Sequence, residues 1–178
     1  AIVGYIIAGP VLGHRPLLAL SASTVGNVAD YVLFIALGLA SAVLAVVFMR
    51  LMLWTERRAF DLPAPPILKP ALAGIPAGLC LFWLPEVTGI GIGTMHSTLE
   101  GNVFGMGDLV IILIAKLVLT AVCVGFGLAT GVFTPGLVIG LLFGALVGEG
   151  LAIVLESGHS GLGIFAVYGA VAVASPVI

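Results

Sequence analysis

An uncharged run of 32 residues, 117–148, is the feature that most limits how this chain can fold. About 20 residues of α-helix cross the hydrocarbon core of a bilayer, so this run is too long for one ordinary span. A glycine-rich break at residues 125–130 divides the run and predicts one helix ending near Gly125 and another beginning near Phe133. The second helix would then start at membrane depth, where non-helical backbone is tolerated only inside protein or beside a cavity.

The composition indicates an integral membrane protein with the lipid bilayer as its surroundings. Of the 178 residues, 61% are hydrophobic and 8% are charged, against about 25% charged in soluble domains. The net charge of −2 is too small to indicate a nucleic-acid partner. Cys80 and Cys123 lie in apolar runs and are interpreted as buried thiols, from which neither a disulfide nor a compartment is inferred. Both chain ends fall inside apolar runs, which predicts that residues 1–178 are a single, partial transmembrane domain truncated at both ends.

The apolar pattern predicts about six helical segments of unequal length, several of them broken by Gly or Pro. The first half is predicted to contain an apolar segment at 1–13, a span at 31–49 capped by Asp30 and continuing to Arg58, a turn at 62–66, and a short kinked or tilted helix at 70–85 containing Pro76. A loop follows at 88–107, with a short helix at 95–99, and then a helix from Leu109 to Val124 capped by Asp108. The chain continues with a helix at 133–155, a polar turn at 156–161 and a last run at 162–178. Interrupted helices of this kind favour a transporter-like fold, in which half-helices point at a midplane site.

One end of the predicted long span carries half of the basic residues, Arg50, Arg57 and Arg58, together with Trp54. Tryptophan is enriched at membrane interfaces, and loops rich in Lys and Arg face the cytoplasm. This end is therefore predicted to be cytoplasmic.

The segment Gly131-Val132-Phe133-Thr134-Pro135 opens the second helix of the long run. Gly131 lets the backbone approach a ligand closely, and Pro135 in a first turn costs little because its missing N–H would be unbonded anyway. The amides that remain, with the positive end of the helix dipole, suit an anion that must also leave again. The alternative is a helix start bracketed by Gly and Pro that binds nothing.

Two further patterns lie inside the apolar helices. Lys116 stands alone in one of them and has two open interpretations: a structural partner of a carboxylate or of helix-terminal carbonyls, or a source of positive potential for an ion pathway. Glycines recur every four residues in the next helix, which predicts a close-packing stripe. The stripe consists of Gly136, Gly140, Gly144 and Gly148.

The remaining polar residues give no support for catalysis. Glu149 and Glu156 follow the glycine stripe of this helix and are interpreted as solvated helix-end residues. His96 and Glu100 have the i, i+4 spacing of metal ligands on a helix, but no third ligand lies nearby in the sequence. No nucleophile–base arrangement or phosphate loop is present, so the prediction is a protein that is not an enzyme and that needs no cofactor or metal.

The segment 115–121, the glycine-rich break, the Gly131–Pro135 element, Leu137 and Gly140 together resemble the CLC family of chloride channels and chloride–proton antiporters. The family pattern is a basic residue, a Thr four residues later, a glycine-rich turn and Gly-Val/Ile-Phe-x-Pro at a helix start. The glycines of 89–93 and the segment 168–176 resemble other family segments in the same order. Here the turn contains Leu128 and Ala129 where the family pattern is richer in Gly and Ser.

This resemblance implies an all-α polytopic membrane fold that consists of two inverted repeats with tilted and broken helices. The chain would hold the end of the first repeat and most of the second repeat. It implies chloride transport by a homodimer in a bacterial inner membrane or plasma membrane. The backbone amides of Val132 and Phe133 would bind the anion, supported by Gly131, Thr134 and Pro135. The family elements that carry the gating glutamate and the pore tyrosine are absent from residues 1–178, so channel and antiporter both stay open. A membrane-embedded structural or interaction segment without an ion pathway is the alternative.

Overall fold

The computed structural model describes residues 28–65, 67–87, 105–128, 131–155 and 162–175, and every element in these ranges is helical. The predicted all-α class is confirmed for this part of the chain, whereas the features predicted for 1–13, 95–99 and 156–161 lie outside it. In chain order, the elements are α2 (Val28–Asp61), α3 (Leu68–Trp83), the 3-10 helix η1 (Pro85–Val87), α5 (Met106–Gly125), α6 (Phe133–Leu155) and α7 (Leu162–Ala174).

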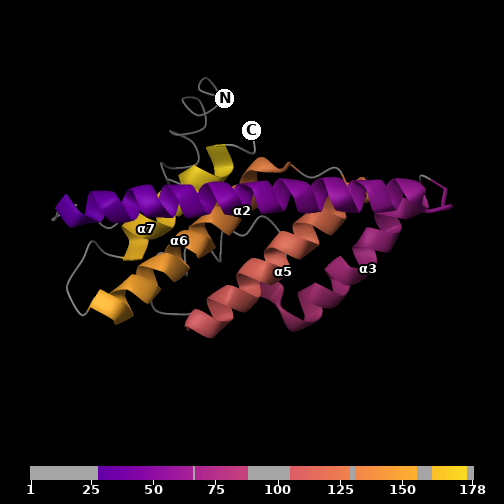
Figure 1. Cartoon of the computed structure of the whole chain (residues 1–178). Coiled ribbons are helices and arrows are strands. Elements are labelled where there is room, and N and C mark those ends of the chain that lie inside the picture. Colours follow the sequence, from indigo (N-terminus) through magenta and orange to yellow (C-terminus); the bar gives the residue numbers. More distant parts are fainter. Residues whose placement is uncertain (1–27, 66, 88–104, 129–130, 156–161, 176–178) are drawn as a thin grey trace, which may run out of the picture.

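Helix α2 is the longest element and lies across the other helices (Figure 1). Its 34 residues give a length of about 51 Å, well beyond the 30 Å of a bilayer core. The predicted continuation of the span past Arg50 is therefore confirmed. The predicted cap is wrong: Asp30 lies inside the helix, which already begins at Val28, because no Gly or Pro interrupts the backbone between these positions.

Helix α3 follows a short helix-free turn, as predicted, and occupies 16 residues with Pro76 in its interior. At about 24 Å it is shorter than the bilayer core is thick. Leu84 ends it and donates its N–H to the carbonyl of Cys80 at 2.7 Å.

Helix α5 begins three residues before the position predicted from its apolar pattern. Gly105 is the N-cap and Asp108 is the third helical residue, so the prediction of Asp108 as the N-cap is wrong. The carboxylate still serves the helix start, because the N–H of Gly105 donates to Asp108 Oδ2 at 3.3 Å. Glycine has no side chain to complete the reciprocal half of a capping box.

The core lies where α6 packs along α7. A Cβ on Gly140 would meet the carbonyl oxygen of Gly169, and one on Gly144 would lie 2.9 Å from the Cα of Ala166. At Gly148 a Cβ would be 3.1 Å from Cβ of Phe165. The predicted close-packing stripe is thus confirmed at these three positions, where bare backbone of α6 touches α7 directly.

Three of the described helices are long and apolar enough to cross a membrane: Tyr31–Asp61 within α2, Met106–Gly125 and Phe133–Leu151 within α6. Half of the most apolar window of α6 is buried, against 28% for each of the other two. Helix α6 is therefore the central element, while α2 and α5 expose large apolar side chains such as Ile35, Leu39 and Ile114. Apolar exposure of this extent suits a bilayer.

Candidate anion site at the start of helix α6

The turn that precedes the candidate site is a glycine-capped helix end. Gly127 has φ 86°, a left-handed conformation that glycine adopts without strain. Its N–H donates to the carbonyl of Val124 at 3.0 Å, and the N–H of Leu128 donates to that of Cys123 at 2.9 Å. These two bonds form a Schellman motif, so Leu128 is accommodated in a turn that the family pattern fills with smaller residues.

Helix α6 starts at the predicted element, and its hydrogen bonds define which amides remain free for a ligand. The N–H of Gly136 donates to the carbonyl of Val132 at 3.0 Å, which makes Val132 the N-cap and Phe133 the first helical residue. The N–H groups of the N-cap and the first three residues have no partner within a helix. Pro135 is third and lacks an N–H, so Val132, Phe133 and Thr134 present the donors.

The side chains around these donors differ in burial. Gly131 is exposed, and nothing lies within 4 Å of a Cβ built on it. Val132 packs against the hydrophobic core, whereas the ring of Phe133 is 51% exposed. The helix start is therefore anchored through Val132, with open space beside Gly131 and Phe133.

Lys116 lies on α5, and its side chain is only 3% exposed. Its Nζ donates a 2.8 Å hydrogen bond to the carbonyl oxygen of Val87, the last residue of η1. This bond confirms the interpretation of Lys116 as a partner of a helix-terminal carbonyl. A buried ammonium group requires such an acceptor. Val87 itself was not predicted, because 29 residues separate the two positions and no local pattern connects them.

Another polar contact, which the sequence pattern does not reveal, joins helices α2 and α5. The Oγ1 of Thr55 lies 2.7 Å from the carbonyl oxygen of Ala121, and 2.8 Å from that of Met52 in its own helix. The side chain is 4% exposed. A single Thr at the charged end of a long helix gives no signal that its hydroxyl bonds a neighbouring helix.

The two cysteines are free thiols, and both are half-buried rather than buried as predicted. His96 and Glu100, whose spacing alone would suit a metal and for which no site was predicted, lie outside the described residues.

Comparison with known proteins places these features in a family. The family model described as voltage gated chloride channel matches residues 1–178. The chain is 28% identical over 166 residues to chloride channel protein CLC-f of Arabidopsis thaliana, covering 88% of this chain and 21% of that protein. It is 27% identical over 173 residues to the H(+)/Cl(-) exchange transporter ClcA of Vibrio campbellii, covering 95% of this chain and 37% of the relative.

A bacterial relative named as a channel is similar to the same extent. The voltage-gated ClC-type chloride channel ClcB of Escherichia coli O81 is 31% identical over 161 residues, which is 89% of this chain and 38% of that protein. The chain thus spans less than two-fifths of the length of these three relatives. A family match along every residue, together with apolar helices long enough to span a bilayer, identifies an integral membrane protein that belongs to the voltage-gated chloride channel (CLC) family.

Proposed function

We propose that this chain forms part of the membrane domain of an anion transporter, and that it contributes one wall of a chloride site. The observation that carries the proposal is the start of α6, where Val132 caps the helix and Pro135 occupies its third position. The relatives named above are called chloride channels and a chloride–proton exchanger, which supports chloride as the ligand.

Helix geometry explains why this arrangement suits a passing anion. Moving a small ion from water into a medium of low dielectric constant costs on the order of 20 kcal/mol by the idealised Born estimate. Convergent amides and the positive end of the helix dipole offset part of this cost. They carry no full charge, so the ion is not held too tightly to leave.

Further parts of the proposal follow the family rather than the geometry. We propose a homodimer, located in a bacterial inner membrane or plasma membrane, that carries chloride and has no enzymatic activity or cofactor. Both proton-coupled exchange and channel conduction fit residues 131–135, because the relatives include proteins named for each activity.

A backbone substitution tests the proposed amide ligand directly. Phenyllactic acid placed at Phe133 replaces the amide by an ester, which removes one N–H and keeps the ring. Hydrogen bonds to charged groups contribute about 1.5–3 kcal/mol, so the affinity for chloride should fall by about tenfold or more. The measurement is chloride flux from liposomes. The same ester at Phe82, which is 87% exposed on α3, is the control.

Side-chain variants test the space around the amides. Gly131→Leu should obstruct the approach of an anion and lower chloride flux, and Phe133→Ala should alter flux or selectivity. The matched controls are Gly74→Leu, where nothing lies within 4 Å of the added Cβ, and Phe82→Ala. Unchanged flux and selectivity in the ester, Gly131 and Phe133 variants would favour a structural segment without an ion pathway.

A further inference from the structure

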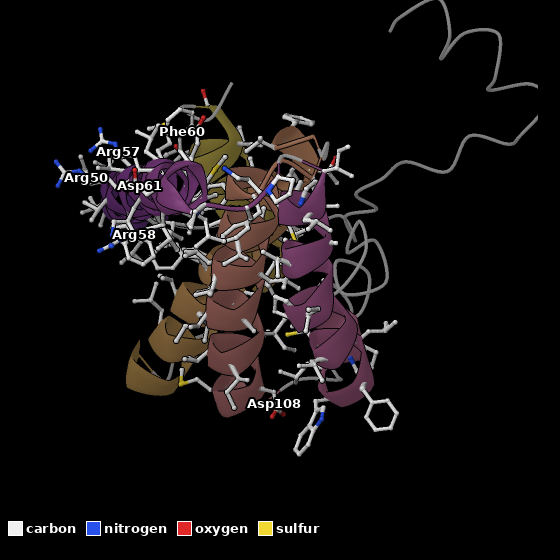
Figure 2. The ribbon with its side chains drawn as sticks, turned by 90° about the vertical axis from the view of Figure 1, so that its right-hand side faces the viewer. Arg50, Arg57, Arg58, Phe60, Asp61 and Asp108 are labelled. Carbon is white, nitrogen blue, oxygen red and sulfur yellow. The ribbon has the colours of Figure 1, made fainter. Side chains whose placement is uncertain are left out.

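Basic residues gather at one end of the helix bundle, where the last turns of α2 meet the start of α3 and the end of α5. Four of the six Lys and Arg residues lie here, Arg50, Arg57, Arg58 and Lys69, with the acidic residues Glu56 and Asp61 among them. Four positive and two negative charges leave this end at +2. Asp108 lies at the opposite end (Figure 2).

The arginine side chains are free to reach a ligand outside the bundle. Arg50 and Arg57 are two turns apart on α2 and therefore share a face; both are exposed and point away from the neighbouring helices (Figure 2). Arg58 is also exposed, and its Cζ lies 5.3 Å from the centre of the Trp54 ring. Within the described residues, no carboxylate forms an ion pair with these arginines.

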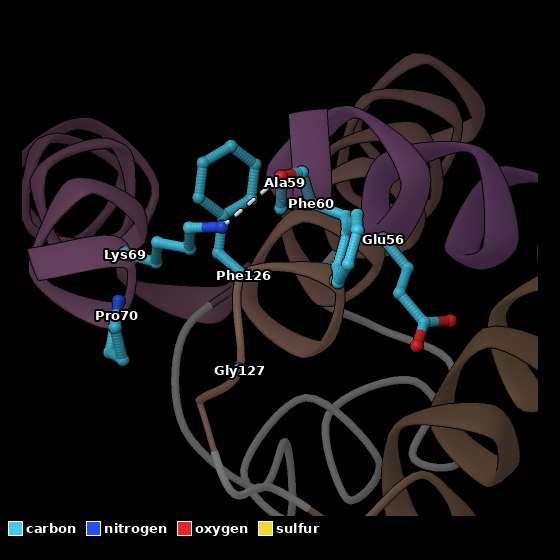
Figure 3. A pocket seen from close by; sticks show the side chains of 8 residues that line it. Glu56, Ala59, Phe60, Lys69, Pro70, Phe126 and Gly127 are labelled. Atoms are coloured by element: carbon cyan, nitrogen blue, oxygen red, sulfur yellow. Dashed lines mark hydrogen bonds between the residues drawn. The ribbon is translucent and has the colours of Figure 1, made fainter. Parts of the chain in front are cut away.

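Exposed aromatic side chains lie at the same end of the bundle, as is typical of a membrane boundary. Trp54 is 55% exposed and Phe60 is 84% exposed, directly after the uncharged span of α2. Lys69 Nζ donates to the carbonyl oxygen of Phe60 at 3.4 Å and lies 5.7 Å from the ring centre. The pair borders an open hollow of about 230 Å³ between the ends of α2, α3 and α5 (Figure 3).

We propose that this end binds the headgroups of anionic phospholipids, with Arg50, Arg57 and Arg58 contacting phosphate and Trp54 seated at the level of the headgroups. Guanidinium groups form paired hydrogen bonds with phosphate oxygens, and tryptophan favours the boundary between headgroups and acyl chains. Clusters of basic residues beside a membrane span attract the anionic lipids of the inner leaflet. The proposal does not depend on the chloride site.

Quenching of Trp54 by brominated lipids tests this proposal. The protein, produced in full, carries Trp54 as its single tryptophan with all others changed to Phe, and is reconstituted with brominated phosphatidylglycerol or brominated phosphatidylcholine at equal mole fraction. We expect stronger quenching by the anionic lipid and a preference that weakens with salt. A second single-tryptophan protein that keeps Trp83, 81% exposed at the end of α3, should show no preference.

Charge variants assign the preference to the arginines. The double variant Arg50→Gln, Arg57→Gln keeps Arg58, the arginine that lies over the Trp54 ring, and should weaken the preference by about fivefold for each arginine removed. Asp61→Asn removes a nearby negative charge and should strengthen it. Equal quenching of Trp54 by both lipids, or a preference that survives loss of both arginines, would overturn the proposal.

A soluble anion is the competing ligand for the same guanidinium groups. Inorganic phosphate should reduce the lipid preference no more than sodium chloride does at matched ionic strength. If phosphate abolishes the preference while chloride does not, the arginines bind a free phosphate instead and the assignment to lipid is wrong.

Discussion

Thr55 of α2 and Gly125 of α5 lie in direct contact: a Cβ on the glycine would be 2.7 Å from Cβ of the threonine and 2.8 Å from the backbone nitrogen of Glu56. The Thr55 hydroxyl bonds the carbonyl oxygen of Ala121 one turn earlier in α5. Absence of a side chain at Gly125 therefore sets how closely the two helices approach, immediately before the turn that leads to the candidate anion site.

Gly125→Ala should destabilise the protein by about 1–2 kcal/mol. Overpacking costs about 1–3 kcal/mol, and the better helix propensity of Ala returns up to about 1 kcal/mol. The measurement is the midpoint of thermal unfolding in detergent. Gly78→Ala on α3, with nothing within 4 Å of the new Cβ, is the control and should be neutral or stabilising. An unchanged midpoint for Gly125→Ala would show that α2 and α5 can move apart without cost.

Gly144→Ala should lower stability by about 1–3 kcal/mol through the contact between α6 and α7. The new Cβ would meet the carbonyl oxygen of Phe165 as well as Cα of Ala166, and backbone atoms cannot turn aside as a side chain can. Gly150→Ala is the matched control on the same helix, because its Cβ would meet only the flexible end of Met106 at 3.5 Å. Equal unfolding midpoints for the two variants would contradict close backbone packing at Gly144.

Gly127→Ala should cost about 1–2 kcal/mol, because the residue has φ 86° and a left-handed conformation is unfavourable for residues with a Cβ. Nothing lies within 4 Å of the added atom, so backbone conformation alone is tested. Gly127→Asn should cost less, since Asn tolerates this conformation better. Thermal unfolding of the two variants checks the order, and an equal loss for Ala and Asn would argue against the Schellman turn.

Lys116→Met should loosen the short helix η1. The substitution keeps an unbranched apolar side chain but removes the donor that bonds the carbonyl of Val87 at 2.8 Å. Faster amide hydrogen exchange is expected at residues 84, 86 and 87, which flank or follow Pro85, because this segment loses an anchor on α5. Lys69→Met, which removes a half-buried lysine at the other end of α3, should leave exchange in this segment unchanged. Unaltered exchange in the Lys116 variant would show that other contacts hold η1.

Local sequence patterns predicted much of this fold, because hydrophobic runs and helix-breaking glycines act on the chain within a few residues. The uncharged run of 32 residues and its glycine-rich break located α5 and α6, whose observed ends at Gly125 and Phe133 match the prediction. Helix starts were less predictable. Asp30 and Asp108 are both typical caps, yet the helices begin two residues before each of them, since a carboxylate inside the first turn also suits the helix dipole.

The sequence by itself determined the membrane character of this protein, its helix order and the Gly131–Pro135 helix start, because hydrophobicity and backbone restrictions act over a few residues. Tertiary structure alone decided the contacts between distant segments. The acceptor for Lys116, the pairing of Thr55 with Ala121 and the identity of α7 as the helix that meets the glycine stripe depend on how helices cross. Such crossings are set by side-chain packing over the whole bundle, which no local pattern encodes.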